Sequence, residues 1–170
     1  RLRILVAGSP DIAWFMEGGR RGALSVRSIL EGNGVPFAGV GSLLDFGCGC
    51  GRVLRHLMDD GVAISGSDLN SKLIRWCRAN LARGSFSVNP LTPPLPHADG
   101  DFGLVYALSV FTHLPEDLQK PWLRELARVL RTGGHLVVST HGERYREALD
   151  LTATINEALP FNILSGFGSV

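Results

Sequence analysis

Short apolar segments alternate with longer amphipathic segments through the middle of this chain. The short segments have the length of β-strands and are almost wholly apolar, as expected of strands that a sheet buries on both faces. Strands that alternate with helices are typical of a parallel sheet with helices packed on both faces. The predicted strands are 42–46, 62–67, 85–88, 102–107 and 135–140.

The segments between the strands carry signals of helix boundaries. Asn70 suits the N-cap of a helix, and Pro115 suits a first helical turn. Residues 132–134, with the sequence Thr-Gly-Gly, are expected to close the helix that Pro115 opens. The predicted helices are 51–60, 71–83, 116–130 and one that begins near Glu143.

The N-terminal part reads differently from the rest. Apolar residues at helical spacing predict a helix over 23–30, which the Gly-Asn-Gly of residues 32–34 would stop. We therefore expect residues 1–41 to form a helical lead-in or lid and residues 42–170 to form the ligand-binding domain. The chain begins at Arg1 rather than at Met, which suggests a fragment or a processed chain.

Composition narrows the class of protein. A chain of 170 residues that is 45% hydrophobic and 19% charged suits one soluble globular domain. The net charge of +1, with no run of Lys and Arg, argues against a nucleic-acid partner, and no apolar run has the length of a membrane span. The odd count of three cysteines and the lack of a secretion signal favour reduced thiols and a cytoplasmic location.

The stretch LDFGCGCGR, residues 44–52, directly follows the first predicted strand. Cys48 and Cys50 are only one residue apart and have no second pair, so we expect no metal site. The glycine pattern is G-x-G-x-G, whereas nicotinamide and flavin sites use G-x-G-x-x-G. No Gly-Lys-Ser/Thr follows, which excludes a P-loop.

The loop nevertheless suits a ligand. Glycines permit positive φ and let a ligand approach the backbone closely. The helix expected over 51–60 would present free N–H groups to a carboxylate, and Asp45 would add a fixed negative charge for an ammonium group. A zwitterionic amino-acid ligand therefore fits this loop better than a pyrophosphate does.

Four motifs follow one another along the chain. Residues 43–51 combine the acid with G-x-G-x-G, and Asp68 ends the second predicted strand about 20 residues later. Residues 99–107 form a strand with an acidic lead-in, and residues 126–136 precede the last predicted strand. Together they resemble the class I S-adenosylmethionine-dependent methyltransferases over residues 42–141. This resemblance implies an α/β, three-layer Rossmann-like fold with a mostly parallel central sheet.

The chain departs from the family pattern at several positions. Asn89 stands where an acid often contacts adenine, and Gly103 stands where Asp is common, which should weaken that strand slightly. Thr132 replaces a common Pro. Few residues remain for the family's last two strands, and residues 162–170 resemble an irregular tail, so a sheet truncated at its C-terminal edge is one expectation.

The resemblance, together with the rule that ligands bind at the carboxyl ends of parallel strands, implies the site residues. Asp68 would accept hydrogen bonds from ribose hydroxyls, and Asn89 would pair with the adenine edge. His113 is the candidate general base, its alternative role being a packed histidine at a helix start. The predicted cofactor-binding residues are Asp45, Gly47, Cys48, Gly49, Asp68, Leu69, Asn89, Leu91, Ala107 and Leu108.

The function implied by the resemblance is methyl transfer from S-adenosylmethionine. The expected acceptor is a small molecule, and a protein acceptor is left open. We expect neither a nucleic-acid partner nor a membrane association. Two alternatives stay open at this point. One is a nucleotide-binding α/β enzyme such as an oxidoreductase, and the other is a non-catalytic module that binds S-adenosylmethionine or a partner.

Overall fold

The computed structural model describes residues 2–58 and 61–139 and the backbone of residues 162–163. The predicted helix near Glu143 lies outside these residues. In chain order the elements are α1 (Leu2–Ala7), α2 (Ile12–Gly32), the 3₁₀ helix η1 (Phe37–Val40), β1 (Ser42–Phe46), the 3₁₀ helix η2 (Leu54–His56), β2 (Ala63–Asp68), α3 (Ser71–Asn80), β3 (Ser85–Val88), β4 (Phe102–Ala107), α4 (Glu116–Val129), β5 (Leu130–Val138) and β6 (Asn162–Ile163).

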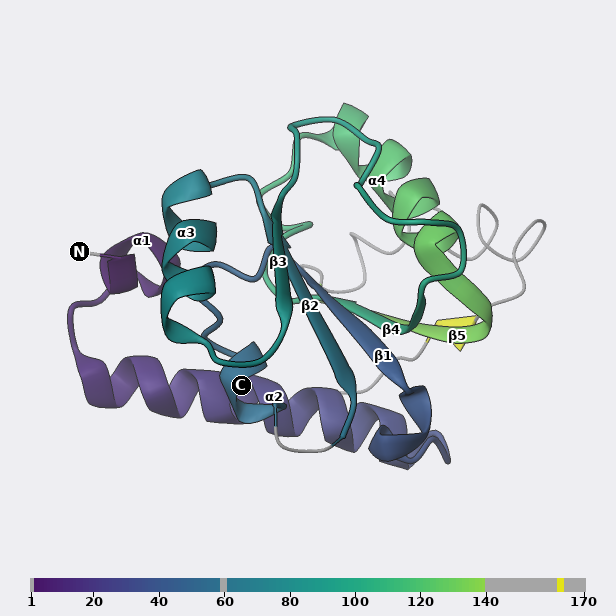
Figure 1. Ribbon diagram of the computed structural model, residues 1–170, viewed down its shortest axis with the longest axis horizontal. Helices are drawn as coiled ribbons and strands as arrows, with labels where there is room; N and C mark the ends of the chain where they lie inside the picture. The colour runs from purple at the N-terminus through teal and green to yellow at the C-terminus, as the bar shows by residue number, and fades with distance from the viewer. Residues whose placement is uncertain (1, 59–60, 140–161, 164–170) are drawn as a thin grey trace.

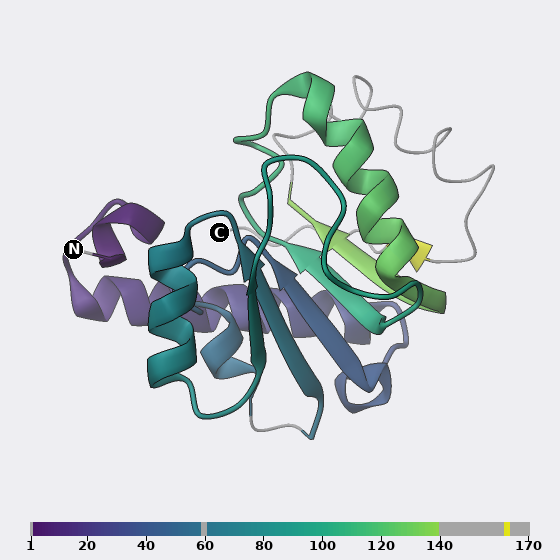
Figure 2. The ribbon, with the colours of Figure 1, turned by 45° about the horizontal axis from the view of Figure 1, so that its top comes forward.

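The described strands form one sheet in the order β3-β2-β1-β4-β5-β6. Every pair of neighbours is parallel, so the carboxyl ends of the strands meet at one edge. Helices α2 and α3 lie on one face of the sheet and α4 lies on the other (Figures 1 and 2). The predicted three-layer α/β fold is confirmed.

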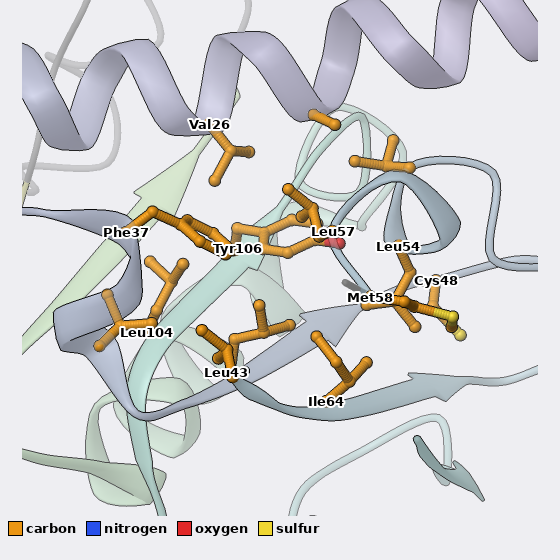
Figure 3. Packing of buried hydrophobic residues seen from close by; sticks show 14 of the residues in the cluster. Val26, Phe37, Leu43, Cys48, Leu54, Leu57, Met58, Ile64, Leu104 and Tyr106 are labelled. Carbon is orange, nitrogen blue, oxygen red and sulfur yellow. The ribbon is translucent and has the colours of Figure 1, made fainter. Parts of the chain in front are cut away.

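The face under α2 holds the larger part of the core. Val26 and Leu30 of α2 are fully buried and belong to one apolar cluster with Leu43 of β1 and Tyr106 of β4 (Figure 3). Each large apolar side chain buried in this way stabilises the fold by roughly 1.5–3 kcal/mol. Helix α2 therefore forms part of the helical layer that covers this face of the sheet. It begins well before residue 23, where the sequence predicted its start.

The opposite face is covered by α4. Trp122 and Leu126 of this helix pack on Leu44 and Phe46 of β1, and the ring centroids of Phe46 and Trp122 lie 4.6 Å apart. Parallel strands buried on both sides need apolar residues at consecutive positions, which is why β1 is apolar apart from Ser42 at its start and Asp45.

The predicted helix over 51–60 is wrong within the described residues. Only the three residues of η2 are helical there. A Cβ on Gly19 of α2 would lie 2.2 Å from the carbonyl oxygen of Arg52, so α2 presses directly on this backbone. The tight approach of the two segments leaves a 3₁₀ turn in place of a regular helix.

The start of β5 also differs from the prediction. Helix α4 ends at Val129, but residues 132–134 lie inside β5 and do not form a separate turn. The ladder shifts register there, since Phe102 pairs with Leu130 and Leu104 pairs with His135. The two glycines are thus absorbed in an irregularity of the strand. At the far edge, Asn162 and Ile163 pair with β5, so the prediction of an irregular tail is wrong for these two residues.

Within the part of the chain that the structure describes, no helix is both long and apolar enough to cross a membrane.

Candidate functional site

The predicted binding residues meet at the carboxyl edge of the sheet, because they follow β1, β2, β3 and β4. Backbone hydrogen bonds tie these strand ends together. The amides of Gly47 and Cys48 donate to the carbonyl of Ser67, at 2.8 and 2.9 Å, and the amide of Asn89 donates to the carbonyl of Asp68 at 3.2 Å. The glycine loop and the ends of β2 and β3 therefore form one connected surface.

Asp68 holds the glycine loop in place. One carboxylate oxygen accepts from the amide of Gly49 at 2.9 Å, and the other accepts from the amide of Asn70 at 2.8 Å. The side chain is only partly buried. Each carboxylate oxygen has a second lone pair, so Asp68 can also accept hydrogen bonds from a ligand diol.

The glycine loop adopts the backbone that its sequence predicts but offers fewer amides than expected. Gly47, Gly49 and Gly51 have φ values of +80°, +57° and +66°. The amide of Gly51 donates to the carbonyl of Cys48, and those of Gly47, Cys48 and Gly49 are used as described above. With no α-helix after the loop, the predicted cradle of free N–H groups at a helix start is wrong at these positions.

Two valines cover the loop, and sequence reasoning missed both. A Cβ on Gly47 would lie 2.3 Å from Cγ2 of Val110, and a Cβ on Gly49 would lie 3.0 Å from both methyl groups of Val6. Val110 follows β4 and Val6 belongs to α1. Both contacts join segments far apart in the sequence, so no local pattern could reveal them.

Asp45 is a buried carboxyl group beneath the loop, with an exposed fraction of 4%. Its pKa is raised to about 7, mainly because the low-polarity surroundings disfavour the charged form, and the nearby Asp68 acts in the same direction. The hydroxyl of Tyr106, which pairs with Asp45 in the β1–β4 register, acts in the opposite direction. Such a group gains from a cationic ligand, which would stabilise the carboxylate.

Asn89 presents an unsatisfied polar atom at the same edge. Its amide nitrogen donates to the carbonyl of Pro90 at 2.9 Å, but its buried Oδ1 has no partner among the described residues. A buried acceptor of this kind needs a hydrogen-bond donor, which a bound ligand could supply. The exposed side chains of Leu69 and Leu91 flank the position with apolar surface.

The end of β4 lies beside the end of β1, on the side away from β2 and β3. Ala107 is buried and Leu108 is partly buried, packed with the α2-side cluster. Ser109 has φ of +58°, which is uncommon for a residue with a side chain, and its amide donates to Oγ of Ser139 at 2.6 Å. His113 lies in the following turn with its side chain exposed.

The thiols of the loop region are turned inward. Sγ of Cys48 and Sγ of Cys77 both lie near the carbonyl oxygen of Gly49, at 3.6 and 3.5 Å. Both side chains are buried, so they support the loop and do not face a ligand. Among the described residues, no three His, Cys, Asp or Glu side chains come together as a metal site requires.

Two aromatic residues, Tyr106 at the end of β4 and Phe111 in the turn after it, lie close in sequence to this edge. Tyr106 and Phe111 are fully buried, on opposite faces of the sheet. Neither contributes to the surface of the edge, so both belong to the core.

Comparison with known proteins gives a consistent result. Residues 44–138 match a family described as a methyltransferase domain. The chain is 31% identical over 104 residues to the methyltransferase GfsG of Streptomyces halstedii, covering 57% of this chain and 36% of the relative. It is 31% identical over 98 residues to the malonyl-[acyl-carrier protein] O-methyltransferase of Enterobacter lignolyticus, covering 58% of this chain and 38% of the relative.

A solved structure extends the similarity over more of the chain. It is the TehB-like SAM-dependent methyltransferase of Corynebacterium glutamicum, with a TM-score of 0.60 and 25% identity. The alignment covers 87% of this chain and 76% of that structure. The chain spans well under half the length of the two curated relatives, so the similarity concerns the shared domain.

Proposed function

The chain belongs to the family of methyltransferase domains, and we propose that it binds S-adenosylmethionine and transfers the methyl group to a small-molecule acceptor. The unpaired Oδ1 of Asn89, beside the partly exposed carboxylate of Asp68, carries this proposal. An adenosine presents an amino donor and a ribose diol, and these two side chains offer matching acceptors on neighbouring strand ends.

The residues at the edge fit the remaining parts of the cofactor. The ammonium of its methionine moiety suits Asp45, whose pKa is raised by burial and which therefore gains from a positive partner. The exposed side chains of Leu69 and Leu91 offer apolar surface to the adenine ring. The glycines at 47 and 49 have positive φ and no side chain, so a ligand that displaces the covering Val6 and Val110 can approach the backbone.

In this proposal the bound cofactor supplies an activated methyl group on a sulfonium. The protein must align the acceptor with that methyl and keep water away. Leu108, which is only partly buried directly after β4, provides apolar surface for this purpose, and the fully buried Ala107 supports the end of the strand. His113, exposed in the turn that follows, is proposed to take the proton from an acceptor hydroxyl.

Charge and thiol content support a small acceptor and a reducing compartment. The net charge of +1 is too small to favour a nucleic-acid acceptor. The thiols of Cys48, Cys50 and Cys77 are free and buried, which suits the cytoplasm that we propose as the location.

Calorimetric titration with S-adenosylmethionine, S-adenosylhomocysteine and NAD tests the cofactor directly. We expect the two adenosyl compounds to bind with micromolar affinity and NAD not to bind. Incubation with labelled S-adenosylmethionine and a panel of hydroxylated and carboxylated small molecules then tests transfer. Binding of NAD alone would refute the proposal, and cofactor binding with no turnover on any acceptor would favour a non-catalytic binding module.

Replacing Asp68 by Ala should weaken binding of S-adenosylhomocysteine more than tenfold. The substitution removes the acceptor for ribose and also the partner of the Gly49 amide, and a hydrogen bond to a charged group contributes roughly 1.5–3 kcal/mol. Asp117→Ala, on the exposed start of α4, is the control. Unchanged affinity in the Asp68 variant would remove this residue from the site.

Replacing Gly49 by Val should abolish measurable binding of S-adenosylhomocysteine while the sheet stays folded. The new side chain would meet Val6 and fill the face of the loop that a ligand needs. Gly34→Val is the matched control, because Gly34 has a similar φ of +74° but open space around it. Circular dichroism checks the fold of both variants, and normal binding by the Gly49 variant would disprove the role of the loop.

A further inference from the structure

A cavity lies beside the glycine loop, where Cys50 forms part of its lining. Helix α1, the start of α2 and helix α3 lie side by side there (Figures 1 and 2), and they line an open cavity of about 290 Å³. It shares Cys50 with the glycine loop, but no residue from the carboxyl ends of β2, β3 or β4 lines it, so it is distinct from the position beside Asp68 and Asn89. The lining residues are Leu2, Arg3, Ile12, Phe15, Met16, Cys50, Arg55 and Trp76.

The walls of this cavity are mostly apolar and partly aromatic. Phe15 is buried, while Met16 and Trp76 are partly buried. The volume is at the lower end of the range for small-molecule pockets, which are typically lined by apolar and aromatic side chains with a few polar groups. The cavity thus suits the ring of a small ligand.

The polar groups of the cavity are cationic. The Arg55 guanidinium lies 5.6 Å from the ring centroid of Phe15 and 5.4 Å from that of Trp76. Its Nε donates to the carbonyl of Gly51 and its Nη2 to the carbonyl of Cys50, both at 3.0 Å. Among the described residues no carboxylate forms an ion pair with Arg55.

The charge of Arg55 is therefore fixed but not neutralised. Two backbone carbonyls and two aromatic rings hold the guanidinium in one orientation, which reduces the entropy lost when a ligand binds. The five N–H groups of a guanidinium exceed those used by these contacts, and carboxylates are its preferred partners. Arg3 lines the same cavity and adds a second positive charge.

We infer that this cavity binds a small aromatic carboxylate. The ring would contact Phe15 and Trp76, and the carboxylate would pair with the guanidinium of Arg55. This site is distinct from the proposed cofactor site, and the inference holds whatever acceptor the domain methylates.

Titration of the full chain with phenylacetate and with phenylacetamide, its neutral analogue of similar shape, tests the inference. We expect phenylacetate to bind with submillimolar affinity and the amide to bind at least tenfold more weakly. Equal binding of both compounds, or no binding of either, would overturn the inference.

Replacing Arg55 itself would also disturb the glycine loop, because the carbonyls of Cys50 and Gly51 accept hydrogen bonds from it. A substitution at the rim of the cavity avoids this problem. Ile12 lines the cavity but is 60% exposed, so Ile12→Glu should fold normally and place a negative charge at the opening. We expect this variant to lose at least tenfold in affinity for phenylacetate. Ala13→Glu is the control, because Ala13 is exposed on the same helix and does not line the cavity. Equal affinity in the two variants would contradict the assignment of the site.

Discussion

Replacing Asp45 by Asn should stabilise the folded chain by about 4 kcal/mol at pH 8 and should have little effect at pH 4. The folded pKa of about 7 lies well above the unfolded value of 3.8, and each unit of difference corresponds to 1.36 kcal/mol. The amide of Asn has nearly the same shape as the carboxyl group and carries no charge to bury.

The direction of this effect follows from proton binding. Below pH 3.8 the carboxyl group is protonated in both the folded and the unfolded state, so it does not lower the free energy of unfolding. As pH rises toward 7, the unfolded chain loses this proton while the folded chain keeps it, so the wild-type protein becomes less stable. Above pH 7 the full cost of a buried carboxylate is present. The Asn variant has no carboxyl group at this position, so its stability does not fall in this way as pH rises.

Urea unfolding of both proteins at pH 4, 6 and 8, followed by tryptophan fluorescence, measures the difference. The same variant should bind S-adenosylhomocysteine more weakly, because it lacks the charge that an ammonium needs. Gain in stability together with loss of binding would identify a carboxylate that is retained for function. An equal free energy of unfolding for both proteins at pH 8 would disprove the raised pKa.

Replacing Gly103 by Ala should destabilise the fold by about 3 kcal/mol, a cost typical of severe overpacking. A Cβ at this position would lie 2.0 Å from the carbonyl oxygen of Val40, which is backbone and cannot rotate away. The sequence suggested only that this glycine weakens its strand slightly. The structure shows that β4 and η1 can approach each other only because residue 103 lacks a side chain.

Gly39→Ala provides a matched control within η1 itself. A Cβ on Gly39 would meet no atom within 4 Å, and this residue has no positive φ, so alanine should be neutral or slightly stabilising there. Thermal unfolding of the two variants beside the wild type gives the comparison. Similar melting temperatures for both variants would show that the Val40–Gly103 approach is not rigid.

The layers of the fold could be predicted because a strand that is buried on both faces has apolar residues at consecutive positions. The apolar runs at 42–46 and 102–107 correspond closely to β1 and β4, whereas η2 replaces the helix expected over 51–60. The failure has a tertiary cause, since the glycines of α2 let that helix press on the backbone of Arg52. A local sequence pattern contains no information about such an approach.

The site likewise has features that the sequence predicts and features that depend on long-range packing. The rule for parallel strands brought Asp68 and Asn89 to one edge, and the two residues are indeed joined there through a backbone hydrogen bond. The inward hydrogen bonds of the loop amides and the cover by Val6 and Val110 depend on long-range packing, so they could not be predicted. The role of His113 as a base stays a prediction.

The contact between Val6 and Gly49 sets a limit on how tightly any ligand can bind to that face of the loop. A molecule that touches Gly49 there must first displace α1, which is packed through Leu2, Val6 and Ala7 against a small cluster with Phe15. The apparent dissociation constant then equals the intrinsic constant divided by the fraction of molecules with α1 displaced. If that fraction were about one in a hundred, the affinity would fall by about a hundredfold. Residues of α1 that never touch the ligand would in this way tune its affinity.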